Sequence, residues 1–320
     1  MNKQQEINDL ILQYANEGLS VQCHAVPIWH IPGFYFDQEG HQSAKRLMEE
    51  DAQAAYTAAM AYRLTGDAVY AEQVVRLLDG WASVNQGFAD NDGPLVSAYI
   101  GTGLIQAAEQ MKDYEGWSME SKEVFAHWLT DVCMPAWDGI TGRNNWWSWS
   151  LHAQLCVYRF LEDIDGIKGE AMLLKAHIDE SLEPSGFIPE ETERGTNAMW
   201  YHYFSLAPMT AAARIVADRT GEDLFRWISP RGNCLKKALD TLLYYVDGRA
   251  EQWPFEKEQH VPAPLAADTW PLDLYEGLIP IYNDPKYEAF VKPYRPITGH
   301  MNRRSGYFQS YAWCFPTIQL

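Results

Sequence analysis

The sequence predicts an all-α fold of helical hairpins arranged as an (α/α) toroid with a central cleft. Apolar residues recur with helical spacing along most of the 320 residues, and no convincing run alternates as a strand would. Two connectors look alike, because residues 63–67 and 219–222 each end an Ala-rich helix with Gly and supply an acid to the next helix. Hairpins repeated in this way stack either into an open solenoid or into a closed ring.

About ten helices account for most of the chain. They are expected at residues 4–18, 43–64, 68–84, 95–113, 118–133, 146–163, 168–182, 198–218, 222–247 and 265–280, the ninth being broken near residues 230–232. The part after about residue 252 is rich in Pro and Tyr, so we expect a less regular segment that wraps the helices. No linker stands out, and a single domain over residues 1–320 is predicted.

The composition argues against nucleic acid as a partner. With a net charge of −18 and no basic run, the chain lacks the clustered Lys and Arg on which such binding depends. Aromatic residues make up 13% of the chain, and they could stack on sugar rings or simply fill a large core. An acidic ligand would need a locally positive pocket, and a short oligosaccharide would be repelled less than a polymer.

Nothing at the N-terminus resembles a secretory signal, and no apolar run is long enough to span a bilayer. The five cysteines are an odd number, widely spaced and without a CxxC pair, which favours reduced thiols over disulfides or zinc. We therefore expect a cytoplasmic protein without a membrane partner, a trimmed secreted form being the alternative. The oligomeric state is not predicted.

Arg194 and Tyr201 are seven residues apart, so a helix would place them on one face with Asn197 between them. A nearby cation favours the phenolate form of tyrosine, which would make Tyr201 a proton acceptor. The planar fork of Arg194 suits a carboxylate. The alternative is that Tyr201 packs in a helix wall and Arg194 is a solvated charge.

A second candidate segment opens a Trp-rich helix. Asn144 and Asn145 stand at its start, where an amide either binds a substrate carboxylate or caps the helix. Trp146, Trp147 and Trp149 cover more than one side of that helix, so at least one should face the cleft while the others pack.

These segments resemble the alginate-lyase-like polysaccharide lyases, uronate-cleaving enzymes built on an incomplete (α/α) toroid. The resemblance covers roughly residues 45–215, including the helix pair at 58–82 and the stretch 191–194 followed by Tyr201 and His202. In that family an Arg and a Tyr seven apart, with an Asn directly followed by His, form the catalytic group. The resemblance therefore implies Asn145, Arg194 and Tyr201, while Trp146 occupies the position of the His.

An indole cannot act as a base, so two explanations stay open. Either Tyr201 serves as both base and acid in a syn elimination, or another histidine takes the vacant role. His202 matches the Tyr-His sequence of the family, although its side chain would point about 100° away from that of Tyr201 on an ideal helix. His152 and His300 are the other candidates.

Further side chains are expected to bind the sugar. The rings of Trp29 and Tyr35 suit stacking, with ordinary packing as the alternative. His300 and Arg304 could return to the cleft and counter the negative charge of the protein, or lie in a solvated loop. The full set of expected substrate-binding residues is Trp146, Trp147, Trp149, Asn144, Asn197, Trp29, Tyr35, Arg304 and His300, and the expected catalytic set is Tyr201, Asn145, Arg194 and His202.

The expected function is cleavage of a uronic-acid-containing polysaccharide or oligosaccharide by β-elimination, with neither a metal nor an organic cofactor required. The sequence lacks the motifs of several other enzyme classes, namely a Walker loop, a dinucleotide fingerprint, HExxH and a nucleophile elbow. One alternative is a glycoside hydrolase that pairs Glu191 with Asp90 or Asp92. The other is a glycan-binding protein without activity. The uronate, the linkage and the choice between endo and exo cleavage are not predicted.

Overall fold

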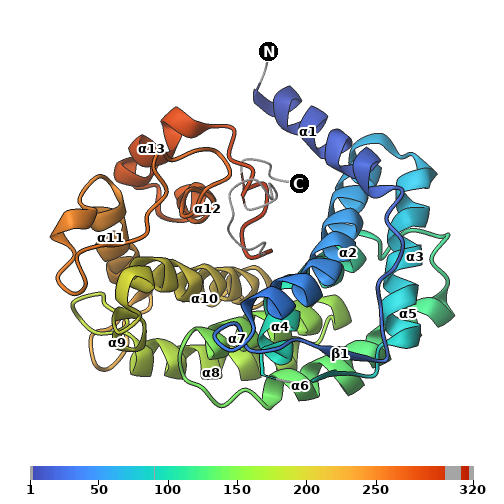
Figure 1. The fold of residues 1–320 in the computed structure, drawn as a ribbon, viewed down its shortest axis with the longest axis horizontal. Helices are drawn as coiled ribbons and strands as arrows, with labels where there is room; N and C mark the ends of the chain where they lie inside the picture. Colours follow the sequence, from blue (N-terminus) through green and yellow to red (C-terminus); the bar gives the residue numbers. More distant parts are fainter. Residues whose placement is uncertain (1–2, 90, 300–310, 317–320) are drawn as a thin grey trace. The chain divides into compact units, whose positions relative to one another are not determined.

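The computed structural model describes residues 3–89, 91–299 and 311–316 (Figure 1). They form two compact units. The first comprises the described residues up to Ile140, together with 160–162 and Tyr311, and the second comprises 141–159, 163–299 and 312–316. The expectation of one domain over the whole chain stays a prediction.

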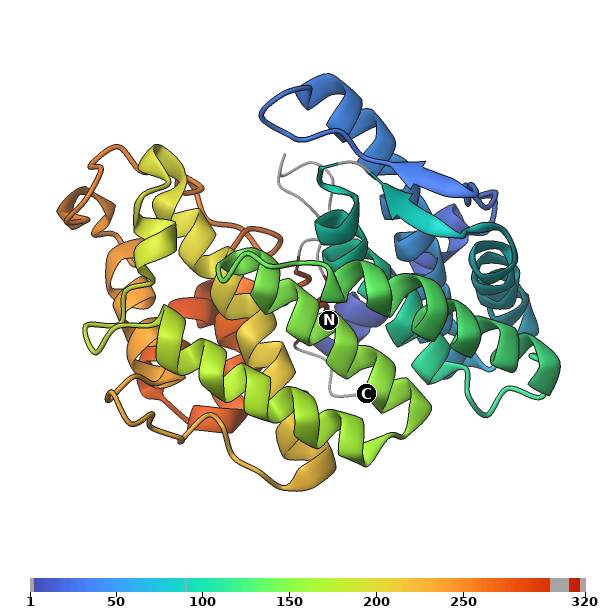
Figure 2. The same cartoon turned by 90° about the horizontal axis from the view of Figure 1, so that it is seen from below.

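The first unit is built around α2 (Gln38–Thr65), which packs against α1, α3 and α4. The first half of α2 buries only one of its faces. Residues 54–61 of α2 are all buried, because neighbouring helices cover every side of the helix there. Two short parallel strands, β1 and β2, pair side by side with Trp29 opposite Phe88 (Figure 2). The other elements of this unit are α1 (Lys3–Gly18), β1 (Ile28–His30), α3 (Ala68–Val84), β2 (Gly87–Ala89), α4 (Gly93–Gln110), α5 (Met119–Trp128), η1 (Leu129–Cys133) and α6 (Met134–Asp138).

The second unit is built around α10 (Ala198–Thr220), which packs against α8, α9 and α11 (Figures 1 and 2). Most of α10 is buried on all sides, as expected for a helix without a polar face. The other elements that belong mainly to this unit are α7 (Asn145–Leu161), α8 (Ile164–Ser181), α9 (Pro189–Thr192), η2 (Gly195–Asn197), α11 (Leu235–Val246), η3 (Ala250–Gln252), α12 (Leu272–Tyr282), α13 (Pro285–Val291) and η4 (Lys292–Tyr294).

The glycines of the two similar connectors end their helices as predicted. Gly66 and Gly221 adopt φ angles of 72° and 76°, the left-handed conformation that an L side chain resists. Asp67 then caps α3 by accepting a hydrogen bond from the amide of Val69. The second connector differs, because no helix begins directly after Glu222.

The helix expected over 222–247 is therefore wrong in its first half, since α11 begins only at Leu235. In the segment before α11, side chains form hydrogen bonds with backbone amides. The carboxylate of Asp223 accepts hydrogen bonds from the amides of Phe225 and Arg226, and the hydroxyl of Ser229 accepts from two amides further on. Such local bonds replace the helical ladder and produce turns.

Short elements were not predicted. The strands β1 and β2 span three residues each, too few to display an alternating pattern. The helix expected over 118–133 ends as an α-helix at Trp128 and continues through the π-helical turn η1. Within the described ranges, no helix combines the length and apolarity needed to cross a membrane.

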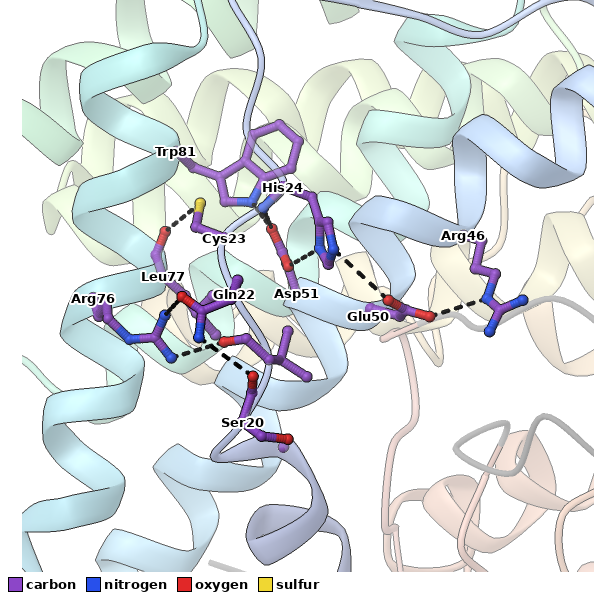
Figure 3. Close-up of polar contacts among 12 residues, drawn as sticks. Ser20, Gln22, Cys23, His24, Arg46, Glu50, Asp51, Arg76, Leu77 and Trp81 are labelled. Carbon is purple, nitrogen blue, oxygen red and sulfur yellow. Dashed lines mark hydrogen bonds and ion pairs between the residues drawn. The ribbon is translucent and has the colours of Figure 1, made fainter.

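A buried carboxylate fixes the chain between α1 and β1 onto α2 and α3 (Figure 3). Asp51 accepts hydrogen bonds of 2.8 Å from the backbone amide of His24 and from the indole of Trp81, and His24 Nδ1 lies 2.8 Å from its other oxygen. Burial raises the pKa of Asp51, while the bonds from His24 and Trp81 oppose that rise. The carboxylate thus joins three segments that are far apart in sequence.

Replacing Asp51 by Ala should lower the free energy of unfolding by about 3 kcal/mol, because buried donors lose their acceptor. Glu50→Ala is the matched control. Glu50 makes only partly exposed ion pairs, an i,i+4 pair with Arg46 and a 3.9 Å contact with His24, so its loss should cost less than about 1 kcal/mol. Denaturant unfolding measures both changes. Equal losses in the two variants would contradict the assigned role of Asp51.

Candidate active site

The start of α7 shows which of two neighbouring amides caps the helix. The backbone carbonyl of Asn144 accepts hydrogen bonds from the amides of Trp147 and Ser148, and its side-chain Oδ1 accepts from the amide of Trp146 at 3.0 Å. Asn144 is therefore the N-cap. Asn145 is the first helical residue, and its side chain is available for another purpose.

Asn145 binds Glu191, which lies 46 positions further along the chain. Its backbone amide donates to Glu191 Oε1 at 2.8 Å, and its Nδ2 lies 3.0 Å from Oε1 and 3.2 Å from Oε2. Asn145 is only 1% exposed. Its Oδ1 is buried and has no hydrogen-bond partner in the part of the chain that the structure describes. An acceptor of this kind is costly unless a ligand supplies a donor.

Glu191 is the centre of the site and was not recognised as such from the sequence. Its carboxylate is fully buried, and Oε1 also accepts a hydrogen bond of 2.9 Å from the hydroxyl of Ser205. Arg194 Nε lies 3.5 Å from Oε2. Burial raises the pKa of Glu191, while the bonds from Asn145 and Ser205 and the charge of Arg194 oppose that rise. The N-terminus of α7 also favours a negative charge.

Arg194 and Tyr201 meet as predicted, although not on one continuous helix. Arg194 precedes the 3-10 turn η2, and α10 begins only at Ala198. The centre of the Arg194 guanidinium still lies 5.0 Å from the centroid of the Tyr201 ring, within the range of a cation–π contact. Both side chains are partly exposed. The rings of Tyr201 and Trp200 form a T-shaped pair, with centroids 4.7 Å apart.

The three tryptophans of α7 have different environments. Trp149 is fully buried against Phe204, so the expectation that it binds substrate is wrong. Trp147 is nearly buried beneath the guanidinium of Arg143, 4.0 Å from its ring centroid. Trp146 is partly exposed, and of the three it has the ring most accessible to a sugar.

The expectation that His202 is catalytic is also wrong. His202 is fully buried, its Nε2 accepts a 2.8 Å hydrogen bond from the amide of Ile188, and its Nδ1 faces the carbonyl of Ala198 at 3.2 Å. Burial lowers its pKa to about 4, so the imidazole is neutral and both nitrogens are used within the protein. The bond to Ile188 instead fixes the chain that leads into α9.

Two other histidines of this unit, His152 and His177, are also buried. His152 lies 3.5 Å from the sulfur of Cys156, and burial lowers its pKa to about 3. His177 bonds to the hydroxyl of Ser148 at 2.8 Å, and its pKa is also lowered to about 3. Neither suits the vacant role of the family's His. His300 and Arg304 lie outside the described residues.

The remaining described candidates, Asn197, Trp29 and Tyr35, differ in how far they are exposed. Asn197 is exposed, with its Oδ1 3.0 Å from Nδ1 of His260. In the first unit, Trp29 is only 3% exposed, packed edge-on against Trp81, which overturns its expected part in stacking. Tyr35 is 71% exposed, so its ring remains accessible.

The carboxylate pair of a glycoside hydrolase gains no support. Glu191 is sealed from solvent, and its oxygens accept bonds from protein donors. Asp92 accepts a hydrogen bond from the amide of Phe34 and lies 3.2 Å from Nδ1 of His41. Asp90 lies outside the described residues. Among those described, no group of three or more His, Cys, Asp or Glu side chains is arranged to hold a metal, and all five cysteines are free thiols.

Comparison with known proteins identifies the class. The family model described as alginate lyase matches residues 3–253, so the chain belongs to the alginate lyase family. An alginate lyase from Bacteroides ovatus, 16% identical, has a TM-score of 0.70 over 90% of this chain and 89% of that one. Alginate lyase A1-III from Sphingomonas species A1 is also 16% identical, with a TM-score of 0.71 over 92% of this chain and 90% of that one.

A variant of alginate lyase A1-III complexed with a tetrasaccharide matches with a TM-score of 0.68 at 16% identity, over 88% of this chain and 86% of that one. A search of curated protein sequences gave no match. The predicted fold class, an all-α toroid of helical hairpins, is confirmed by these likenesses. The chain is a polysaccharide lyase of a uronate-cleaving family.

The cap assigned to Asn144 can be tested by stability. Asn144→Ala should lower the free energy of unfolding by about 1 kcal/mol, because the amide of Trp146 loses its acceptor. Asn144→Ser keeps an oxygen that can cap the helix and should retain most of the stability. Urea titration distinguishes the two variants. An Ala variant as stable as the parent would mean that Asn144 does not cap α7.

The buried imidazoles predict a loss of stability in acid. The folded chain holds them neutral below the ordinary pKa of about 6.5, whereas the unfolded chain takes up protons there. Their contribution to the free energy of unfolding therefore falls as the pH drops from about 6.5 toward 4, by about 1.4 kcal/mol per pH unit for each histidine. His202→Gln should make this dependence shallower in denaturant unfolding. An identical slope in parent and variant would contradict a neutral, buried His202.

Proposed function

We propose that the protein cleaves a uronic-acid-containing glycan by β-elimination, with the reacting sugar bound beside Tyr201 and Arg194. The observation that carries this proposal is the contact between the Arg194 guanidinium and the Tyr201 ring, 5.0 Å apart, with Arg194 also beside the Glu191 carboxylate that Asn145 binds. A cation beside a phenol favours its ionised form and so favours proton abstraction. The family of the chain supports the choice of substrate class.

In the proposed reaction the phenolate oxygen of Tyr201 removes the proton at C5 of the uronate. The electron pair of that C–H bond forms the C4–C5 double bond as the bond from C4 to the glycosidic oxygen breaks. Tyr201 then returns the proton to the departing oxygen. Atoms and charge balance without any co-reactant. The new non-reducing end carries the unsaturated sugar.

The developing charge on the uronate carboxylate needs a cation or a donor close by. Arg194 supplies a cation, with a side chain that is 30% exposed. Asn145 adds an amide, since its Nδ2 has a second N–H besides the one directed at Glu191. Together the two groups lower the free energy of the carbanion-like state.

Trp146 at the position of the family's His favours a syn route through Tyr201. An indole takes up no proton, and His202 and His152 are buried and committed to other contacts. The partly exposed ring of Trp146 instead suits stacking on a sugar.

Short acidic oligosaccharides are the proposed substrates. A tetrasaccharide is bound in the variant of alginate lyase A1-III that shares this fold. The net charge of −18 would repel a long polyanion more than a short one.

Turnover can be tested with a panel of uronate-containing oligosaccharides, by following the ultraviolet absorbance of the unsaturated product. The parent should form it, and Tyr201→Phe should lower kcat by at least about a thousandfold, because the same group serves as base and acid. Arg194→Ala should lower kcat/KM by about a hundredfold or more. Tyr244→Phe, at an exposed tyrosine, is the matched control and should leave turnover unchanged.

Two results would overturn the proposal. A Tyr201→Phe variant as active as the parent would remove Tyr201 from the chemistry. Binding of a uronate without any product, unchanged in Tyr201→Phe, would instead identify a glycan-binding protein.

A further inference from the structure

On the basis of the proposed lyase function, we propose that Glu191 is a positioning residue. Its ionised carboxylate holds the Asn145 amide and the Arg194 guanidinium in the orientation in which they receive the uronate carboxylate. Glu191 itself is fully buried and does not touch the substrate. It acts through the two groups that do.

The donor and acceptor atoms determine how Asn145 is oriented. An ionised carboxylate only accepts hydrogen bonds, so the amide must turn its nitrogen toward Glu191 and its oxygen away. The two N–H bonds of an amide diverge too widely for both to point at one carboxylate. One N–H therefore remains for a ligand, beside the buried Oδ1 that has no partner among the described residues.

Protonation of Glu191 would disturb this arrangement. A neutral carboxyl must donate its own proton, yet Asn145 and Arg194 present only donors to it. The proton can go to the hydroxyl oxygen of Ser205, or to Oδ1 of Asn145 after the amide inverts. In either case the attraction that holds Arg194 is lost, and the amide is no longer fixed.

The charged groups around Glu191 define the expected pH dependence. Arg194 faces it and favours the ionised form, whereas α7 contributes the uncharged Asn145 and α10 the uncharged Ser205. His202 of α10 is neutral above about pH 4. Burial nevertheless raises the pKa of Glu191 above its ordinary value, which brings its protonation closer to neutral pH.

The test compares three variants by kcat/KM as a function of pH and by calorimetric binding of a defined oligouronate in the Tyr201→Phe background. Glu191→Gln should lower kcat/KM by about tenfold or more and weaken binding, because the amide and guanidinium lose their fixed orientation. It should also abolish the acid limb of the pH profile, which is the fall in kcat/KM of the parent at low pH. Glu190→Gln makes the same change in charge at an exposed neighbour and should behave as the parent does.

Ser205→Ala tests the role of Glu191 without replacing its carboxyl group. It removes one hydrogen bond that favours the ionised form, so the pKa of Glu191 rises further and the acid limb moves to higher pH. The plateau at higher pH should change little. This variant decides the question if Glu191→Gln does not fold.

The proposal is overturned if folded Glu191→Gln keeps the parent's acid limb and oligouronate affinity, or if the limb of Ser205→Ala does not move. Failure of the lyase function gives a different result, since no variant, the parent included, would form unsaturated product. In that case the calorimetric binding measurement still tests the role of Glu191. Equal affinities of Tyr201→Phe with and without Glu191→Gln would then refute its positioning role.

Discussion

The candidate active site depends on one buried carboxylate, that of Glu191, which accepts hydrogen bonds at the N-terminus of α7. It joins two stretches separated by 46 positions, because Asn145 donates two of its N–H groups to it and Arg194 lies beside it. A charge removed from water is tolerated only when its partners are complete and well directed. The same requirement that holds these segments together also fixes the groups proposed to bind the substrate.

The helices around this carboxylate are closely packed. α10 is buried along most of its length and carries Tyr201 and Ser205 in its first turns. His202, one residue after Tyr201, bonds to the amide of Ile188 and so fixes the short α9 that bears Glu191. A histidine next to the proposed base thus has a structural function, and its lowered pKa reflects the burial that this function requires.

Sequence reasoning located most helices to within a few residues, because apolar spacing and terminal Gly and Asp residues are local signals. It failed over 222–234, where Asp223 and Ser229 bind the backbone instead. The meeting of Arg194 and Tyr201 was predictable from their spacing. The pairing of Asn145 with Glu191 was not, since no local pattern encodes a partner so far along the chain.

A crystal structure of Tyr201→Phe with a bound oligouronate tests the account most directly. The account predicts that the carboxylate of the sugar whose C5 faces position 201 lies within hydrogen-bond distance of Arg194 and of Nδ2 of Asn145, while Glu191 still accepts from the Asn145 backbone amide. A sugar carboxylate bound elsewhere, or a Glu191 side chain turned out to touch the sugar, would contradict it.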